Sequence, residues 1–306
     1  MKIGLALGGG GVKGMAHLGV LRVLEGAHVQ IDIICGSSAG AMVGALYASG
    51  LASAQIQALA RSLSFRQWFG RDKTGMGLFS TEGIRHILDH AIGEDTKIED
   101  LQRPFMCVAV DLDSQKEVVL DSGPVADAVC ASMAYPGLFA PVRIGDRMLF
   151  DGGVLNPVPF DIMRRYGADR VIAVDLGAPE PFFATLDSDA IRRGGVLWQL
   201  LYNLSHQQIF RVVERSLGIM AQELRNHKLA DSPPDLIIYP RVRQVGLLDF
   251  GLIETCFAEG DAAAREMLPE IEKLVAPESG WMIRQGWRRF FEWARRIFPI
   301  RRWSDF

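Results

Sequence analysis

Short apolar segments alternate along this chain with segments in which apolar residues recur at helical spacing. A buried strand is expected where a brief apolar run, often rich in β-branched residues, ends at glycine or at a charged residue. Such runs occupy residues 2–7, 31–35, 105–111, 117–120, 147–150, 170–176 and 235–239. Helical spacing occupies residues 13–26, 39–49, much of 190–230, and 254–275, which Pro269 interrupts.

This order of elements predicts an α/β fold. Strands separated by helical crossovers form a mostly parallel sheet with helices on both faces, so we expect a three-layer α/β/α domain over residues 1–276. The strand at 117–120 follows its predecessor closely, and we expect it to pair antiparallel. Residues 277–280, which run from Pro277 to Gly280, join this domain to a tail of different composition at 281–306.

The composition narrows the class of protein. Of the 306 residues, 49% are hydrophobic and 23% are charged, which suits a folded core and excludes global disorder. The net charge of −3 excludes a basic nucleic-acid-coating protein, and no apolar run is long enough to span a membrane.

Four widely spaced cysteines predict reduced thiols in a cytoplasmic protein, with neither a disulfide framework nor a metal site. The N-terminus reaches glycine too early for a signal peptide, and no cofactor is expected.

The first candidate for chemistry is a glycine-rich loop between a predicted strand and a predicted helix. Four glycines at residues 8–11 are followed by Lys13 and Gly14. Such a loop leaves backbone N–H groups uncovered near a helix N-terminus, where they can bind an anion. The spacing Gly9-x-Gly11-x-x-Gly14 suits a dinucleotide phosphate, but the acid expected at the end of the second strand is missing, since Asp32 stands at its start. The alternative is an oxyanion hole.

The second candidate is Ser38, the central residue of a G-x-S-x-G pentapeptide. Gly36 and Gly40 flank it, and the pentapeptide lies between the strand at 31–35 and the helix at 39–49. This is the context of a nucleophile elbow, in which a sharp turn lifts a serine hydroxyl clear of the sheet. The simpler interpretation is a helix cap at this serine or its neighbour. The strand–turn–helix context favours the nucleophile.

A serine nucleophile needs a base, and the histidines are poorly placed to supply one. His17 lies on a predicted helix, where we expect it half-buried, and His86 and His90 share a helix face typical of a solvated surface. Asp151 is the better partner because it ends a predicted strand. Gly152 and Gly153 follow it and permit a close approach of another loop. The simpler alternative for this Asp-Gly pair is an ordinary turn.

Together, the glycine loop, the G-x-S-x-G pentapeptide and the later D-G-G segment resemble the patatin-like phospholipase family, most clearly over residues 3–165. The resemblance implies a catalytic dyad of Ser38 and Asp151 without histidine, acting on lipid esters of the phospholipase A or lysophospholipase class. It implies an oxyanion hole formed by residues 9–11, that is Gly9, Gly10 and Gly11. Lys13 departs from the arginine of many relatives.

Three other functions remain open beside this one. A thioesterase or an acyltransferase would use the same dyad, and a nucleotide-binding or regulatory module recruited to a membrane would use the glycine loop without catalysis. For the enzyme, the pocket is expected to be built by residues 51–100 and 180–230.

The tail differs from the rest of the chain in charge and aromatic content. Residues 281–306 contain seven arginines against two acidic residues, and four of the six tryptophans. On a helical wheel the aromatic residues and the arginines fall on opposite sides. The expected membrane contacts are Trp287, Phe290, Phe291, Phe298, Arg288 and Arg295. This pattern predicts an amphipathic helix on an anionic membrane, and so a cytoplasmic protein peripheral to the inner face; the alternative is a helix packed on the body.

Overall fold

The computed structural model describes residues 1–63, 65–177 and 208–276. A central sheet has the strand order β10-β9-β1-β2-β5-β8-β7, with β6 also paired to β5. Five strands run parallel: β1 (Ile3–Leu7), β2 (Ile33–Ser37), β5 (Phe105–Asp111), β9 (Arg170–Val174) and β10 (Leu236–Ile238). Three more extend the sheet antiparallel: β6 (Lys116–Leu120), β7 (Val142–Ile144) and β8 (Arg147–Asp151). A separate hairpin pairs β3 (Gly70–Arg71) with β4 (Phe79–Ser80).

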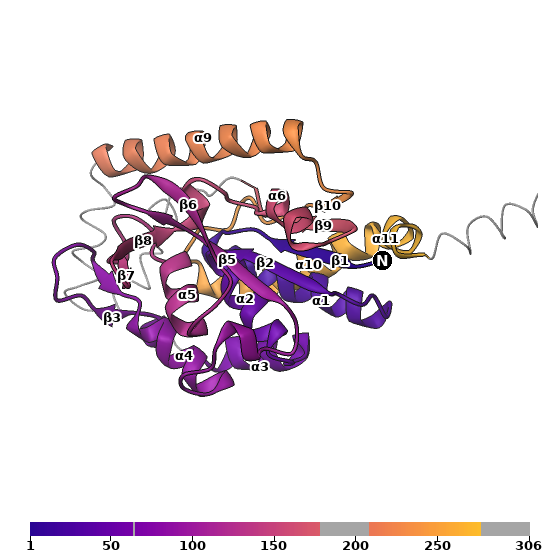
Figure 1. Ribbon diagram of the computed structural model, residues 1–306, viewed down its shortest axis with the longest axis horizontal. Coiled ribbons are helices and arrows are strands. Elements are labelled where there is room, and N and C mark those ends of the chain that lie inside the picture. The colour runs from indigo at the N-terminus through magenta and orange to yellow at the C-terminus, as the bar shows by residue number, and fades with distance from the viewer. Residues whose placement is uncertain (64, 178–207, 277–306) are drawn as a thin grey trace, which may run out of the picture.

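Helices cover both faces of this sheet (Figure 1). The larger layer contains α1 (Ala16–Gly26), α2 (Ala39–Ala48), α3 (Ser53–Ser62), α4 (Glu82–Ile92), α5 (Val125–Ser132) and α10 (Ile253–Glu266). The other face carries α6 (Phe160–Met163) and the long α9 (Gln208–Asp231), while α11 (Leu268–Val275) follows α10. Short 3₁₀ turns occupy Gly11–Met15, Phe65–Trp68, Ile98–Asp100, Gly152–Val154, Arg164–Tyr166 and Phe250–Leu252. The expected three-layer α/β/α arrangement is confirmed.

The parallel strands are buried on both faces because their side chains alternate between two hydrophobic cores. In β1, Leu5 and Leu7 pack with the larger helical layer, whereas Ala6 between them packs with Phe160 and Met163 of α6 and its surroundings. Alternation of this kind follows from the two-residue period of a strand. Strands buried on both sides appear in a sequence as continuous apolar runs, which explains why these strands were predictable.

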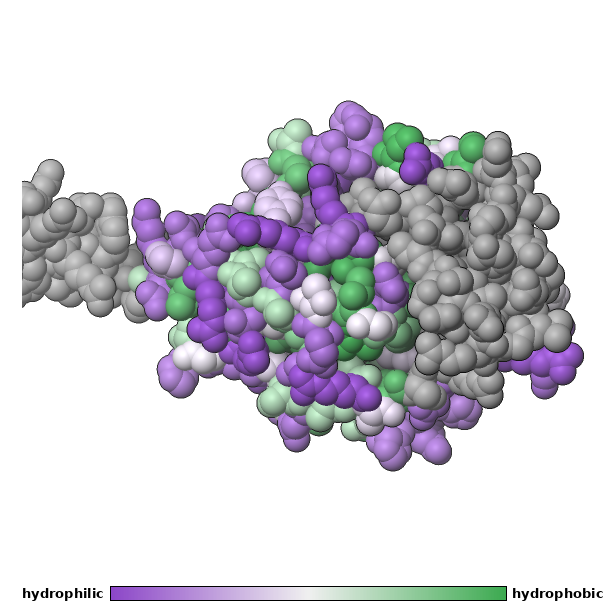
Figure 2. Space-filling model, turned by 180° about the vertical axis from the view of Figure 1, so that it is seen from behind, coloured by the Kyte–Doolittle hydropathy of each residue, from purple (hydrophilic) through white to green (hydrophobic). Residues whose placement is uncertain are grey.

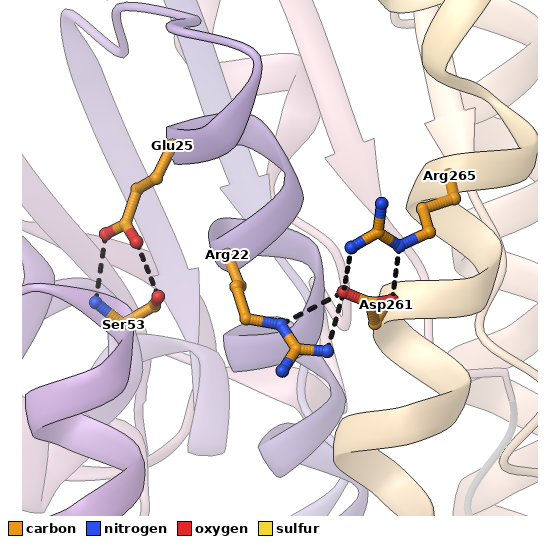
Figure 3. A network of polar contacts seen from close by, with 5 residues as sticks. All are labelled: Arg22, Glu25, Ser53, Asp261 and Arg265. Carbon is orange, nitrogen blue, oxygen red and sulfur yellow. Dashed lines mark hydrogen bonds and ion pairs between the residues drawn. The ribbon is translucent and has the colours of Figure 1, made fainter.

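Polar contacts join α1 to its neighbours in the larger layer (Figure 3). Near its end, Glu25 accepts hydrogen bonds from the N–H and the hydroxyl of Ser53 at 2.9 and 2.5 Å. One turn before Glu25, Arg22 binds Asp261 of α10 at 2.7 Å. Arg265, on the same helix as Asp261, also binds it at 2.7 Å. These contacts hold α3 and α10 on either side of α1.

The predicted boundaries need several corrections. The helix expected from residue 13 begins as a 3₁₀ turn and becomes α-helical only at Ala16, and the second strand is shifted by two residues, to Ile33–Ser37. The helical segment expected at 254–275 does break near Pro269, since α10 ends at Glu266 and Pro269 lies in the first turn of α11. The strand near 117–120 is antiparallel as expected. The helical prediction for residues 190–207 lies outside the described residues, as does the tail, 281–306.

Seen from behind, the described surface is mainly hydrophilic, with hydrophobic side chains in small groups (Figure 2). Several exposed apolar residues belong to α9: Val212, Val213, Ile219 and Met220. The other end of α9 is fixed by ion pairs, since Lys228 binds both Glu117 and Asp161 at 2.9 and 2.8 Å. No helix within the described ranges is long and apolar enough to cross a bilayer.

Candidate active site

Ser38 lies in a strained turn between β2 and α2. Its backbone has φ 52° and ψ −123°, a conformation that few non-glycine residues adopt and that costs of order 1–3 kcal/mol. The turn is possible because Gly40 brings the start of α2 against β1, where a Cβ would overlap the carbonyl of Leu7. The Ser38 N–H donates to the hydroxyl of Ser132 at 2.9 Å. This is the geometry of a nucleophile elbow, with the serine on the wall of a cavity.

Asp151 is the last residue of β8, and its side chain is only 2% exposed. Gly152 permits its approach to the neighbouring strand, since a Cβ there would overlap the carbonyl of Val108 on β5. Oδ1 accepts the N–H of Gly153 at 2.7 Å, and the Asp151 N–H donates to the carbonyl of Ala134 at 3.1 Å. One carboxylate oxygen and the main chain of Asp151 are thus each held by a backbone contact.

Burial raises the pKa of Asp151 to about 6, although hydrogen bonding to the Ser38 hydroxyl and to the Gly153 N–H opposes the rise. The Ser38 hydroxyl is therefore close enough to act on the carboxylate. Among the described residues, Oδ2 makes no contact that meets strict hydrogen-bond geometry, so the contact with Ser38 is a loose one. Catalytic contacts are often loose before substrate binds. A carboxylate with a pKa near neutrality is a better proton acceptor than an exposed one.

The glycine loop presents two backbone N–H groups beside this pair. The N–H groups of Gly10 and Gly11 donate to no backbone carbonyl of the described residues. The N–H of Gly9 is already used, because it donates to the carbonyl of Pro157 at 2.9 Å. Of the three oxyanion donors predicted from the sequence, Gly9 is thus the one whose N–H has a backbone partner in this structure. Gly11 has φ 58°, and a Cβ on it would overlap the carbonyl of Leu247.

His17 and Lys13 are buried beneath the glycine loop. The Nε2–H of His17 donates to the carbonyl of Gly8 at 2.7 Å, and burial lowers the pKa of the imidazole to about 4, so the ring is neutral. The expectation that His17 is half-buried is wrong, since the side chain is fully enclosed. Lys13 is also fully buried, and its charge acts on the thiol of Cys256 in α10. Neither of these two residues is among those that line the cavity at Ser38. Gly14, in the same loop, packs against Ala39 at the start of α2.

A cavity of about 140 Å³ joins these groups. Its wall includes Ser38, Asp151, and the glycines Gly9, Gly10, Gly11 and Gly153. Apart from these groups the wall is almost entirely apolar: Trp68, Phe69, Met133, Leu138, Phe139, Leu217, Ala221 and Phe250 are among its residues. The lining residues Trp68, Phe69 and Ile84, and those of 217–221, fall in the expected pocket regions, whereas the lining residues of 133–139 and 247–253 were not predicted.

The position of Asp32 argues against the binding of a dinucleotide by the glycine loop. Its Oδ2 accepts the N–H of Ile3 at 2.7 Å, which places it at the beginning of β1. The glycine loop follows the other end of that strand. No carboxylate at Asp32 can therefore reach a ribose held by the loop. Within the described ranges, no cluster of three or more His, Cys, Asp or Glu residues could hold a metal ion.

Two known proteins are similar in sequence to most of this chain, which matches only part of each of them. Lysophospholipase nte1 of Aspergillus fumigatus is 28% identical over 280 residues, which is 88% of this chain and 18% of that protein. An uncharacterized NTE family protein of Mycobacterium tuberculosis is 31% identical over 283 residues, which is 89% of this chain and 47% of that protein. The chain thus spans less than half the length of these relatives.

Among solved structures, VipD from Legionella pneumophila aligns with 85% of this chain and 67% of its own, at 14% identity and a TM-score of 0.46. The sequence also matches the patatin-like phospholipase family over residues 5–164. Because that match includes the glycine loop, Ser38 and Asp151 and extends over more than half of the sequence, this chain belongs to the patatin-like phospholipase family.

Proposed function

We propose that this protein is a serine acyl-ester hydrolase that acts on lipids, of the phospholipase A or lysophospholipase type, and that Ser38 and Asp151 are its catalytic dyad. The observation that carries the proposal is the burial of Asp151 beside the Ser38 hydroxyl on the wall of an apolar cavity. Burial gives the carboxylate the raised pKa that a base for a serine needs.

In the proposed reaction, Asp151 accepts the proton of the Ser38 hydroxyl while Oγ attacks the ester carbonyl carbon. The carbonyl π pair moves to oxygen, and the N–H groups of Gly10 and Gly11 stabilise the resulting oxyanion; loss of one such donor typically lowers the rate roughly 10²–10³-fold. The intermediate collapses, the ester C–O bond breaks, and the leaving alcohol takes the proton from Asp151. Asp151 then takes a proton from water as the water oxygen attacks the acyl carbon; the bond from that carbon to Ser38 Oγ breaks, Oγ recovers the proton from Asp151, and the fatty acid is released.

The substrate class follows from the cavity wall. Aromatic and aliphatic side chains such as Phe139, Leu138 and Leu217 can enclose an acyl chain but cannot hydrogen-bond a peptide or a sugar. The name of the Aspergillus relative, a lysophospholipase, agrees with this class. We further propose that the tail, 281–306, brings the enzyme to an anionic membrane surface on the cytoplasmic side, where such esters reside.

The dyad is tested by Ser38→Ala and Asp151→Asn, assayed on a panel of lysophospholipids and diacylphospholipids by mass spectrometry. Both variants should lose ester hydrolysis while remaining folded, because one lacks the nucleophile and the other the base. Matched controls are Ser49→Ala, at the far end of α2, and Asp111→Asn, a buried strand-end acid that bonds Ser114 instead of facing the cavity. A fluorophosphonate should label Ser38 alone, and full hydrolysis by either dyad variant would contradict the proposal.

A further inference from the structure

The chain segment at the end of helix α5 contacts both members of the proposed dyad. The hydroxyl of Ser132, the last residue of α5, accepts the N–H of Ser38 at 2.9 Å. Two residues later, the carbonyl of Ala134 accepts the N–H of Asp151 at 3.1 Å. Two residues from distant parts of the sequence are therefore held by a single three-residue segment.

We propose that residues 132–134 form the frame that sets the separation of Ser38 and Asp151, and that Ser132 is a positioning residue for the nucleophile. This inference rests on the proposed function, since it concerns the same pair of side chains. Ser132 is not proposed to touch the substrate: Met133 of this segment and Tyr135 just after it line the cavity, whereas Ser132 does not.

The frame is itself firmly held. Ser132 is fully buried, and its hydroxyl also bonds the thiol of Cys107 on β5, which lowers the pKa of that thiol against the larger, opposite effect of burial. A serine hydroxyl has one donor and two acceptor sites, so it can serve Cys107 as donor and Ser38 as acceptor at once. The N–H groups of Met133 and Ala134 bond back to Val129 and Ala131, at 2.9 and 3.3 Å. The segment therefore continues the rigid end of α5.

Ser38 needs such a partner because its own turn does not supply one. Ser38 lies just after the last residue of β2, so its N–H takes no part in the strand pairing. It also precedes the first turn of α2, so the helix offers its N–H no carbonyl. Without Ser132 the N–H would be a buried donor with no acceptor, and the peptide between residues 37 and 38 would be free to rotate toward a less strained conformation. Rotation there moves Oγ relative to the carboxylate of Asp151.

The test compares Ser132→Ala with Cys130→Ala in the full chain, using p-nitrophenyl acyl esters. Ser132→Ala should lower kcat roughly 10- to 100-fold with little change in KM, because misplacement of a reacting group affects the chemical step more than binding. Cys130 is a buried residue of the same helix whose thiol contacts the carbonyl of Thr81, away from the cavity, so Cys130→Ala should stay within about twofold of the wild-type kcat.

Two further variants separate the hydrogen bond from packing. Ser132→Cys keeps nearly the same volume but offers only a weak acceptor, and should lose activity as the alanine variant does. Ser132→Thr keeps the hydroxyl and should retain more activity than either. If Ser132→Ala does not fold, the Cys and Thr variants make the same comparison.

A second measurement does not depend on activity. Hydrogen–deuterium exchange, read by mass spectrometry on peptides that contain Ser38, should be faster in Ser132→Ala than in the wild type and unchanged in Cys130→Ala. Wild-type kcat in Ser132→Ala, unchanged exchange at Ser38, or equal losses in the Ser132 and Cys130 variants would each overturn the inference. A wild-type protein that hydrolyses no ester would contradict the proposed function instead, and exchange would still decide the role of Ser132.

Discussion

The main-chain N–H of Gly9 donates to the carbonyl of Pro157 at 2.9 Å, and this bond ties the glycine loop to the segment that follows Asp151. The neighbouring Gly8 N–H donates to the carbonyl of Val174 at the end of β9. The N–H groups of the first two glycines are therefore held by backbone carbonyls, whereas Gly10 and Gly11, whose N–H groups donate to no backbone carbonyl of the described residues, line the cavity. The segment that follows the candidate base, Asp151, therefore also holds the loop that carries the candidate oxyanion donors.

The close approach of Gly9 to the nucleophile predicts the effect of adding one methyl group. A Cβ on Gly9 would lie 3.1 Å from the Cβ of Ser38, so Gly9→Ala should displace the serine by a few tenths of an ångström. We expect kcat to fall roughly 10- to 100-fold with only a small loss of thermal stability. The control is Gly26→Ala at the end of α1, where a Cβ meets nothing within 4 Å. Equal kcat values for the two variants would contradict the predicted contact.

The raised pKa of Asp151 predicts how activity depends on pH. If Asp151 must be ionised to accept the serine proton, kcat/KM should decline below about pH 6, and tenfold for each further pH unit. The measurement is a rate profile on a water-soluble ester between pH 4 and 8, over a range where the fold is intact. A profile that stays flat down to pH 4.5 would exclude Asp151 as the base.

The same burial makes Asp151 a source of instability at neutral pH. Its folded pKa of about 6 exceeds the model-peptide value of 3.8, so the ionised form is disfavoured in the native state by on the order of 3 kcal/mol. This destabilisation is absent below pH 3.8, where Asp151 is protonated in both the folded and the unfolded state, and is fully present above about pH 6, where it is ionised in both. Asp151→Asn should therefore unfold at higher denaturant concentration than the wild type at pH 7.5, and the difference should shrink as the pH falls from 6 toward 4. A variant less stable than the wild type at pH 7.5 would contradict this account.

These features differ in how far a sequence can reveal them. The positions of Ser38 and Asp151 were predictable from local pattern, because Ser38 directly follows a strand between Gly36 and Gly40, and Asp151 ends a strand before two glycines. The proposed role of Ser132 was not, because a serine in an alanine-rich helix gives no local signal, and its partner Ser38 is 94 residues away. The bond between the Gly9 N–H and the Pro157 carbonyl is equally non-local, so the sequence gives no sign that this N–H has a partner.

The strands and the cavity wall also differ in whether a local sequence pattern reveals them. Strands β1, β2 and β5 are buried on both faces and appear as apolar runs, whereas β3, β4 and β7 have only two or three residues and carry no periodicity. Much of the cavity wall comes from residues 133–139 and 247–253, which meet only when the chain has folded. The burial of His17 also depends on a distant contact, since α10 packs over α1.

His17 predicts a second pH effect, of opposite sign to that of Asp151. Its pKa is lowered from 6.5 to about 4, so the unfolded chain binds a proton between these values and the native state does not. Stability should therefore fall as the pH drops from 6.5 to 4, by on the order of 3 kcal/mol from this residue. His17→Gln removes the titrating ring and keeps a donor for the Gly8 carbonyl. Its stability should decline less over this interval in urea unfolding, and an identical decline in both proteins would show that His17 is protonated in the native state.

The tail gives a prediction that separates aromatic anchoring from charge. In the full chain, replacing Trp287, Phe290, Phe291 and Phe298 by alanine should weaken co-sedimentation with every vesicle, because apolar burial at the interface is lost. Arg288→Gln with Arg295→Gln should weaken binding to vesicles rich in phosphatidylglycerol and leave binding to neutral vesicles unchanged, since each basic residue near an anionic surface contributes about 1 kcal/mol. Raised salt should reproduce the arginine effect in the wild type by screening. Binding that neither set of substitutions alters would show that the tail packs on the body and that another surface meets the membrane.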